Sequence, residues 1–161
     1  LRGGAPFGFG RGGEEAEHLV ARGVDFEIVP GITAATAAAS YAGIPLTHRD
    51  YAQSVKFVTG ALKTNVINDD YQGLLDDKQT VVFYMGLNVL EHMVAGLIKV
   101  GKNPATPIAI VANASLPNQQ VLTGTLANIV AKQAEAKLPA PAVITMGEVV
   151  TLHETLAWYG S

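Results

Sequence analysis

The sequence of 161 residues contains no cysteine. Disulfide scaffolds, thiolate zinc sites and cysteine nucleophiles are therefore excluded. Basic residues are also sparse: 11 Lys and Arg stand against 14 Asp and Glu, and they form no run. Because a nucleic-acid surface needs clustered positive charge to neutralise phosphates, we expect no nucleic-acid partner.

Long uncharged apolar runs are absent as well. The most apolar long window, residues 81–100, carries Glu91, His92 and Lys99, which argues against a membrane span. No signal peptide is visible, so we expect a cytoplasmic protein without membrane contact. The first residue is Leu rather than Met, which leads us to expect that upstream residues are missing.

Motifs for metal and nucleotide chemistry are incomplete. The histidines at positions 18, 48, 92 and 153 share no ligand spacing, so we expect no metal site. Residues 8–13 match the pattern G-x-G-x-x-G. A dinucleotide site also needs a strand before the glycines and an acidic residue about 20 positions later, and both are missing here.

Glycine, in contrast, is concentrated near the beginning of the chain. Six glycines stand at positions 3, 4, 8, 10, 12 and 13. Few side chains obstruct such a segment, so its backbone N–H groups can approach a ligand closely. We therefore predict a glycine-rich binding loop on a protein that is 48% apolar and has a packed core.

The apolar pattern predicts an α/β fold. We expect helices at 14–22, 33–41, 88–100 and 126–137, strands at 26–29, 55–59, 80–85, 107–111, 120–123 and 142–146, and a last strand or turn at 149–152. The helix over 88–100 is the best defined, with Asn88 predicted as its N-cap. The irregular alternation predicts a mixed sheet with helices on its faces.

The composition turns polar around residues 47–53, where we predict a domain boundary. Residues 1–47 would then be the end of an N-terminal domain that carries the glycine-rich loop. Residues 48–161 would form a C-terminal α/β domain.

Three ordered segments resemble the tetrapyrrole methylases. Residues 1–15 (LRGGAPFGFGRGGEE) are similar to the second glycine-rich motif of that family, and residues 29–35 (VPGITAA) to the segment that follows it. Residues 42–55 (AGIPLTHRDYAQSV) resemble, more narrowly, the branch that methylates uroporphyrinogen III. Residues 60–63 and 83–87 continue the match in register.

The resemblance implies a two-domain α/β protein that binds S-adenosylmethionine in a cleft between its domains. It implies methylation of uroporphyrinogen III at C-2 and C-7, which gives precorrin-2 and S-adenosylhomocysteine. Two alternatives stay open: a precorrin methyltransferase of cobalamin synthesis, and a truncated or degenerate homologue that binds the cofactor without turnover. The family is usually dimeric, so a homodimer is implied. The pathway branch (sirohaem, cobalamin or haem d1 synthesis) stays open.

The resemblance also assigns site residues. The implied cofactor-binding residues are Gly3, Gly4, Ala5, Gly8, Thr33, Ala34, Met85, Ala114 and Ala142. The substrate carries eight carboxylates, which arginine pairs with in bidentate fashion. The candidates for these contacts are Arg2, Arg11, Arg49 and Lys63. We name no catalytic residue, because the acid/base residues proposed for the family lie upstream of this chain.

Two positions depart from the family pattern. Ala5 stands where the family usually has Asp, and Gly8 stands where it usually has a branched aliphatic residue. The first change could remove a contact to the cofactor. The second should loosen the loop, because glycine has more freedom in the unfolded chain.

Overall fold

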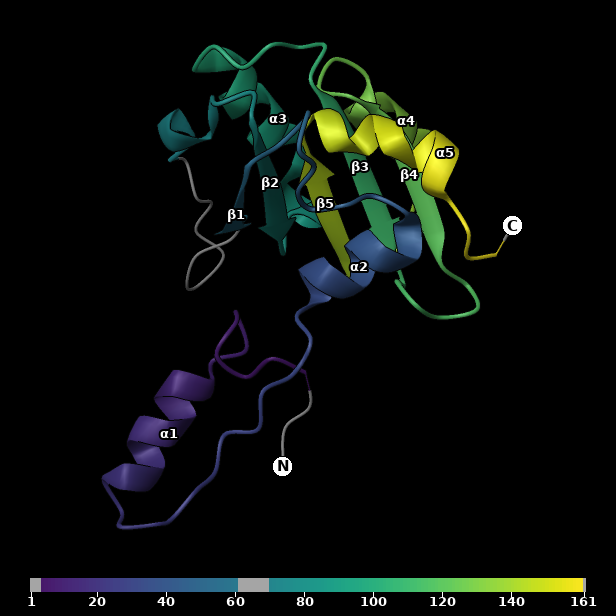
Figure 1. Cartoon of the computed structure of the whole chain (residues 1–161). Helices are drawn as coiled ribbons and strands as arrows, with labels where there is room; N and C mark the ends of the chain where they lie inside the picture. The colour runs from purple at the N-terminus through teal and green to yellow at the C-terminus, as the bar shows by residue number, and fades with distance from the viewer. Residues whose placement is uncertain (1–3, 61–69, 161) are drawn as a thin grey trace.

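A five-stranded mixed sheet forms the centre of the protein (Figure 1). The computed structural model describes residues 4–60 and 70–160. In spatial order the strands are β1 (Ser54–Thr59), β2 (Gln79–Tyr84), β5 (Ala142–Met146), β3 (Pro107–Ala112) and β4 (Gln120–Thr125). The predicted α/β fold with a mixed sheet is confirmed.

The strand directions bring three carboxyl ends to one edge of the sheet. β1 and β2 are parallel, whereas β5 runs antiparallel to both of its neighbours, β2 and β3. β1, β2 and β3 therefore share one direction and end at the same edge, where β4 and β5 begin. We call this edge, with the residues that follow β1, β2 and β3 and precede β5, the carboxyl edge.

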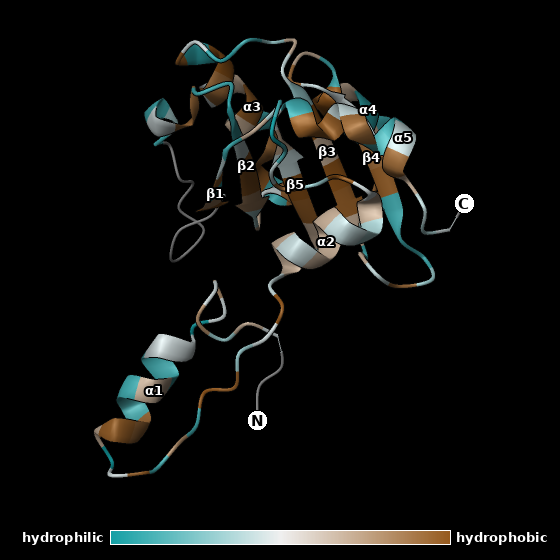
Figure 2. Ribbon diagram, in the orientation of Figure 1, coloured by the Kyte–Doolittle hydropathy of each residue, from teal (hydrophilic) through white to brown (hydrophobic). Residues whose placement is uncertain are grey.

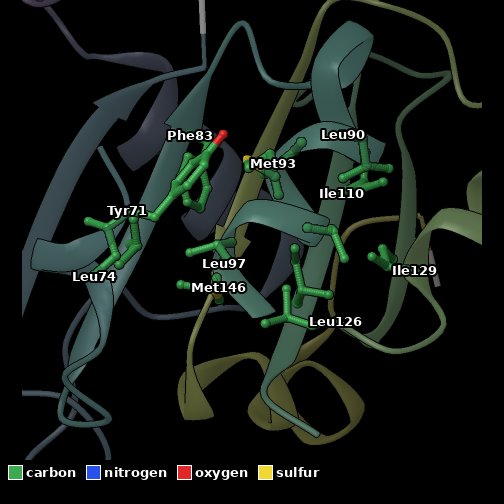
Figure 3. Packing of buried hydrophobic residues seen from close by; sticks show 14 of the residues in the cluster. Tyr71, Leu74, Phe83, Leu90, Met93, Leu97, Ile110, Leu126, Ile129 and Met146 are labelled. Carbon is green, nitrogen blue, oxygen red and sulfur yellow. The ribbon is translucent and has the colours of Figure 1, made fainter. Parts of the chain in front are cut away.

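The central strands are apolar on both faces because helices cover both (Figure 2). Residues 80–83 of β2 and residues 108–112 of β3 are each at most 1% exposed. One face packs against α3 (Leu90–Lys99) and α4 (Ile129–Ala136), and Figure 3 shows Phe83, Met93 and Leu97 meeting there. The short 3-10 helix η2 (Gln72–Leu74) contributes Leu74 to the same core.

The other face is covered by helix α2 (Ala34–Ala42) and the helical turns η4 (Glu148–Leu152) and α5 (His153–Leu156). Ala35, Ala38 and Ala42 of α2 are at most 1% exposed and share a cluster with Val82 and Val111 of the sheet. Small side chains let this helix lie close to the strands. The boundary after Thr47 stays a prediction, and the structure places α2, which precedes it, in one core with the sheet.

Helix α1 (Gly12–Val20) lies away from the sheet, and the glycine-rich loop lies between the two (Figure 1). The chain then runs extended through residues 24–33 and enters α2. The strand predicted at 26–29 is wrong: the segment pairs with no strand among the described residues. Phe26, Ile28 and Val29 have strand propensity, but strand formation also needs a neighbouring chain to complete the ladder.

Two further element boundaries differ from the sequence predictions. Asn88 is not an N-cap, because residues 87–89 form the 3-10 helix η3 (Leu87–Val89) and α3 begins at Leu90. Helix α4 begins at Ile129 rather than at residue 126, since Asn128 accepts a hydrogen bond from the Thr125 N–H and closes a turn there. Of the strand or turn predicted at 149–152, the turn is confirmed: residues 148–156 form helical turns.

Within residues 4–60 and 70–160, no helix combines the length and the apolar character that crossing a bilayer requires. The longest described helix, α3, has 10 residues.

Gly96 in α3 supplies a test of the packing. In an open helix, Gly→Ala stabilises by about 1 kcal/mol. A Cβ on Gly96, however, would overlap ring carbons Cδ2 and Cε2 of Tyr71, which is 5% exposed in the core. Because such overpacking costs about 1–3 kcal/mol, we expect Gly96→Ala to lower the free energy of unfolding in urea denaturation.

The matched control is Gly13→Ala in α1, where an added Cβ would meet no atom within 4 Å. This variant should be neutral or slightly stabilising. A Gly96→Ala protein as stable as the parent chain would show that Tyr71 is not packed as described.

Candidate functional site

The glycine-rich loop and the carboxyl edge of the sheet enclose a cleft of about 630 Å³, which we call the loop cleft. Its walls come from the loop, from the chain just before α2, from α2 along its length to the last turn, from the end of β2 and from the turn after β3. The lining residues are Gly4, Ala5, Gly8, Phe9, Gly10, Ile32, Thr33, Ala34, Ala37, Tyr41, Tyr84 and Ser115. Among the residues that the structure describes, this lining contains no Asp, Glu, Lys or Arg.

Backbone contacts hold the glycine-rich loop in a compact shape. Gly8 N–H donates to the Ala5 carbonyl at 3.0 Å, and Gly12 N–H donates to the Pro6 carbonyl at 2.8 Å. A Cβ on Gly31 would overlap the Gly4 carbonyl oxygen, so glycine is required where the loop meets the chain before α2. The loop and residues 31–33 therefore pack backbone against backbone.

Tyr84 joins this loop to the sheet. Its hydroxyl forms a hydrogen bond with Thr33 Oγ1 and accepts a second one, at 3.0 Å, from the Ala35 N–H. Its ring stacks on Phe9 with the ring centroids 4.5 Å apart. One side chain at the end of β2 thus contacts both the glycine-rich loop and the start of α2. Sequence analysis missed Tyr84, although a tyrosine at the end of a buried strand is a signal for a polar contact there.

A second cleft of about 650 Å³ lies at the same carboxyl edge, and we call it the strand-end cleft. It is lined by Met85, Leu87, Asn88, Val89, Ala140, Pro141 and Ala142. Met85 follows β2 in a left-handed conformation (φ 54°) with its side chain 55% exposed. Ala142 begins β5, which pairs with β2, so the two lining segments belong to neighbouring strands.

The expected cofactor-binding residues divide between the two clefts. Gly4, Ala5, Gly8, Thr33 and Ala34 line the loop cleft, and Met85 and Ala142 line the strand-end cleft. Ala114 is half-buried in the turn after β3, next to Ser115 of the loop cleft. Gly3 lies outside the described residues. All nine assignments stay predictions, with seven of the residues placed at two clefts of one sheet edge.

The two described basic residues that were expected to bind the substrate, Arg11 and Arg49, do not line either cleft. The Arg11 side chain is 76% exposed, and its Nε donates to Glu14 Oε2 at 2.9 Å. Arg49 lies in the turn before β1, at the opposite edge of the sheet, because its neighbour Asp50 accepts a hydrogen bond from Lys78 just before β2. Strands of six residues span roughly 20 Å, which separates this turn from both clefts. Arg2 and Lys63 lie outside the described residues.

Comparison with known proteins identifies the family. The family model of the Tetrapyrrole (Corrin/Porphyrin) Methylases matches residues 1–130. The chain belongs to the tetrapyrrole methylase family. The siroheme synthases of Psychrobacter cryohalolentis and Thiobacillus denitrificans are similar to it, with 61% identity over 161 residues and 58% over 159 residues. The first match covers 100% of this chain and 31% of the Psychrobacter protein. The second covers 99% of this chain and 33% of the Thiobacillus protein. The chain thus spans about a third of their length.

Solved structures share this fold. A native uroporphyrin III C-methyl transferase from Thermus thermophilus is 34% identical, with a TM-score of 0.80 over 94% of this chain and 63% of that one. The same enzyme in complex with S-adenosyl homocysteine gives a TM-score of 0.79. A cobalt precorrin-4 methyltransferase is 26% identical, with a TM-score of 0.80 over 91% of this chain and 62% of the other.

The role of Tyr84 in this tetrapyrrole methylase can be tested by Tyr84→Phe. The substitution keeps the ring on Phe9 but leaves the buried Ala35 N–H and the Thr33 hydroxyl without their shared partner. An unsatisfied buried polar group costs about 1–3 kcal/mol, so we expect a fall of that size in the free energy of unfolding, measured in urea.

Tyr51→Phe is the matched control, because the Tyr51 hydroxyl makes no hydrogen bond within the described part of the chain. It should leave the unfolding midpoint unchanged. Equal effects of the two substitutions would show that the Tyr84 hydroxyl does not hold the loop cleft together.

Proposed function

We propose that this chain holds the S-adenosylmethionine site of a methyltransferase that methylates uroporphyrinogen III at C-2 and C-7 to give precorrin-2. The observation that supports the proposal is the position of the two clefts. They lie at one sheet edge and are lined by residues from segments that resemble the family's glycine-rich loop and the segments after it. The similar enzyme from Thermus thermophilus was solved with S-adenosyl homocysteine.

The dimensions and the chemistry of the clefts fit such a ligand. Small-molecule sites usually enclose about 300–1,000 Å³ and are mostly apolar with a few polar groups, as both clefts are here. In the loop cleft, Gly4, Ala5 and Gly8 leave room for a ligand next to the backbone. In the strand-end cleft, Met85, Pro141 and Ala142 offer apolar walls for a flat ring.

Methyl transfer from a sulfonium needs little from the protein beyond positioning. When bound, the cofactor supplies a methyl group whose bond to sulfur breaks as an electron-rich pyrrole carbon attacks; the bonding electrons stay on sulfur, and the methylated macrocycle then releases a proton to solvent. The chain's own residues would hold the two reactants in line, an effect that can be large. The walls at Thr33, Tyr84 and Met85 would fix the donor and exclude water from it.

Position 5, where Ala5 replaces the Asp usual in the family, allows a test of how the cofactor's ammonium group is bound. S-adenosylhomocysteine carries an ammonium group, and the described residues that line the loop cleft include no carboxylate. A hydrogen bond between charged groups contributes about 1.5–3 kcal/mol. We expect Ala5→Asp to tighten S-adenosylhomocysteine binding roughly 10- to 100-fold, as measured by calorimetry.

Ala5→Asn is the matched control, since it has nearly the same shape without the charge. Ala5→Asn should increase the affinity for S-adenosylhomocysteine less than Ala5→Asp does. Equal affinity of the Asp and Asn variants would contradict an ammonium group near position 5.

The activity is tested on the chain itself. S-adenosylhomocysteine is titrated by calorimetry, and then S-adenosylmethionine and uroporphyrinogen III are supplied and the product mass is measured. Addition of two methyl groups supports the proposal. Turnover only on a later precorrin supports the alternative that the cobalt precorrin-4 methyltransferase similarity favours. Binding without turnover supports a cofactor-binding homologue, which Ala5 favours. No binding overturns the proposal.

The oligomeric state and the cellular compartment are part of the same proposal. The resemblance supports a homodimer, and the lack of a visible signal peptide led us to expect the cytoplasm. Sedimentation of the purified chain at several concentrations tests the dimer. A concentration-independent monomer would contradict it.

A further inference from the structure

Three aromatic rings gather where the last residues of the chain meet helix α2. Tyr41 lies in the last turn of α2, and Trp158 and Tyr159 follow α5. The Tyr41 ring centroid is 5.4 Å from that of Trp158 and 4.8 Å from that of Tyr159, the latter edge-on at 83°. The Tyr41 side chain is therefore in contact with two rings that come from the end of the chain.

Each of the two C-terminal rings also makes a hydrogen bond to the backbone of a separate element. Trp158 Nε1 donates to the Ser40 carbonyl of α2 at 2.8 Å. The Tyr159 hydroxyl donates to the Ser115 carbonyl, in the turn after β3, at 3.1 Å. Tyr41 and Ser115 both line the loop cleft. The end of the chain thus connects two walls of that cleft, although neither Trp158 nor Tyr159 lines it.

The turn after β3 is held in an unfavourable conformation. Asn113 and Ser115 both have left-handed backbones (φ 52° and 71°), which residues with a Cβ rarely adopt. Such conformations persist only where the surroundings fix them, and they concentrate at ligand sites. Gln119 fixes the turn from one side: its Oε1 accepts from the Ser115 N–H at 2.8 Å, and its Nε2 donates to the Tyr41 carbonyl at 3.1 Å. Tyr159 fixes the turn from another side, through its hydrogen bond to the Ser115 carbonyl.

We infer that Trp158 and Tyr159 are positioning residues of the cofactor cleft. They hold the Tyr41 ring and the Ser115 backbone where both border a bound S-adenosyl nucleoside. This inference rests on the proposed function and extends it to residues that do not touch the ligand. If the two rings only anchored the end of the chain, their loss would change stability and leave the affinity for the ligand unchanged.

Tyr159→Phe tests the inference, because it removes one hydroxyl and keeps the aromatic packing. We expect the dissociation constant of S-adenosylhomocysteine to rise about fivefold, the effect of losing one hydrogen bond that orders the site. The midpoint of urea unfolding should change little, since the lost contact is exposed. Tyr51→Phe, at the opposite edge of the sheet, serves as the matched control and should leave the dissociation constant unchanged.

Trp158 supplies a second, independent readout, because it is the one tryptophan of the sequence. Its emission, excited where tyrosine does not absorb, should change as S-adenosylhomocysteine is added to the unmodified chain. The change should be half-maximal at a free ligand concentration equal to the calorimetric dissociation constant.

The outcomes separate this inference from the proposed function. If calorimetry shows binding, while the emission of Trp158 and the affinity of the Tyr159→Phe variant both stay unchanged, the inference is overturned and the proposed function stands. If calorimetry shows no binding to the unmodified chain, the proposed function fails, and the inference fails with it.

Discussion

The contact of Tyr84 with the glycine-rich loop is the interaction on which the rest of the site depends. Helix α1 and the extended chain after it form no ladder with the sheet, so the loop needs another attachment. Tyr84 provides it through a ring stacked on Phe9 and a hydroxyl shared by Thr33 and Ala35. Because Tyr84 ends a strand whose residues 80–83 are fully buried, the loop is attached to the centre of the packed core.

Strand direction explains why residues far apart in the sequence meet at this place. β5 lies between β2 and β3 and runs opposite to both, which makes those two strands end at the same edge. Met85 follows one of them and Ala114 the other, while Ala142 begins β5. A parallel β5 would place Ala142 at the far edge, roughly 20 Å away. The mixed topology is thus a requirement for a site built from these segments.

The sequence predicts the regular parts of the fold and the residues around the clefts, but not the contacts between them. Strong apolar patterns predicted β2, β3 and β5 within one or two residues, because burial on both faces leaves a clear signal. The pattern misled at residues 26–29, since it reports propensity and cannot report whether a partner strand is present. Tyr84 and Tyr159 were missed because their partners, Thr33 and Ser115, are 51 and 44 positions away in the sequence.

The uncharged side chains of the described residues that line the loop cleft indicate which step of the proposed methyl transfer the departure at Ala5 affects. Under the proposed function, a carboxylate at position 5 would pair with the cofactor's ammonium group, whose charge does not change during methyl transfer, and would bind the ground state and the transition state alike. Its replacement by Ala5 should therefore weaken binding and leave the rate at saturation largely unchanged. Tyr41 and Ser115 also line the loop cleft, so changes there should likewise weaken binding and leave the rate at saturation largely unchanged. Under the proposed function, the rate at saturation would depend instead on the residues that hold the donor and the acceptor in line, for which Thr33, Tyr84 and Met85 are the proposed candidates.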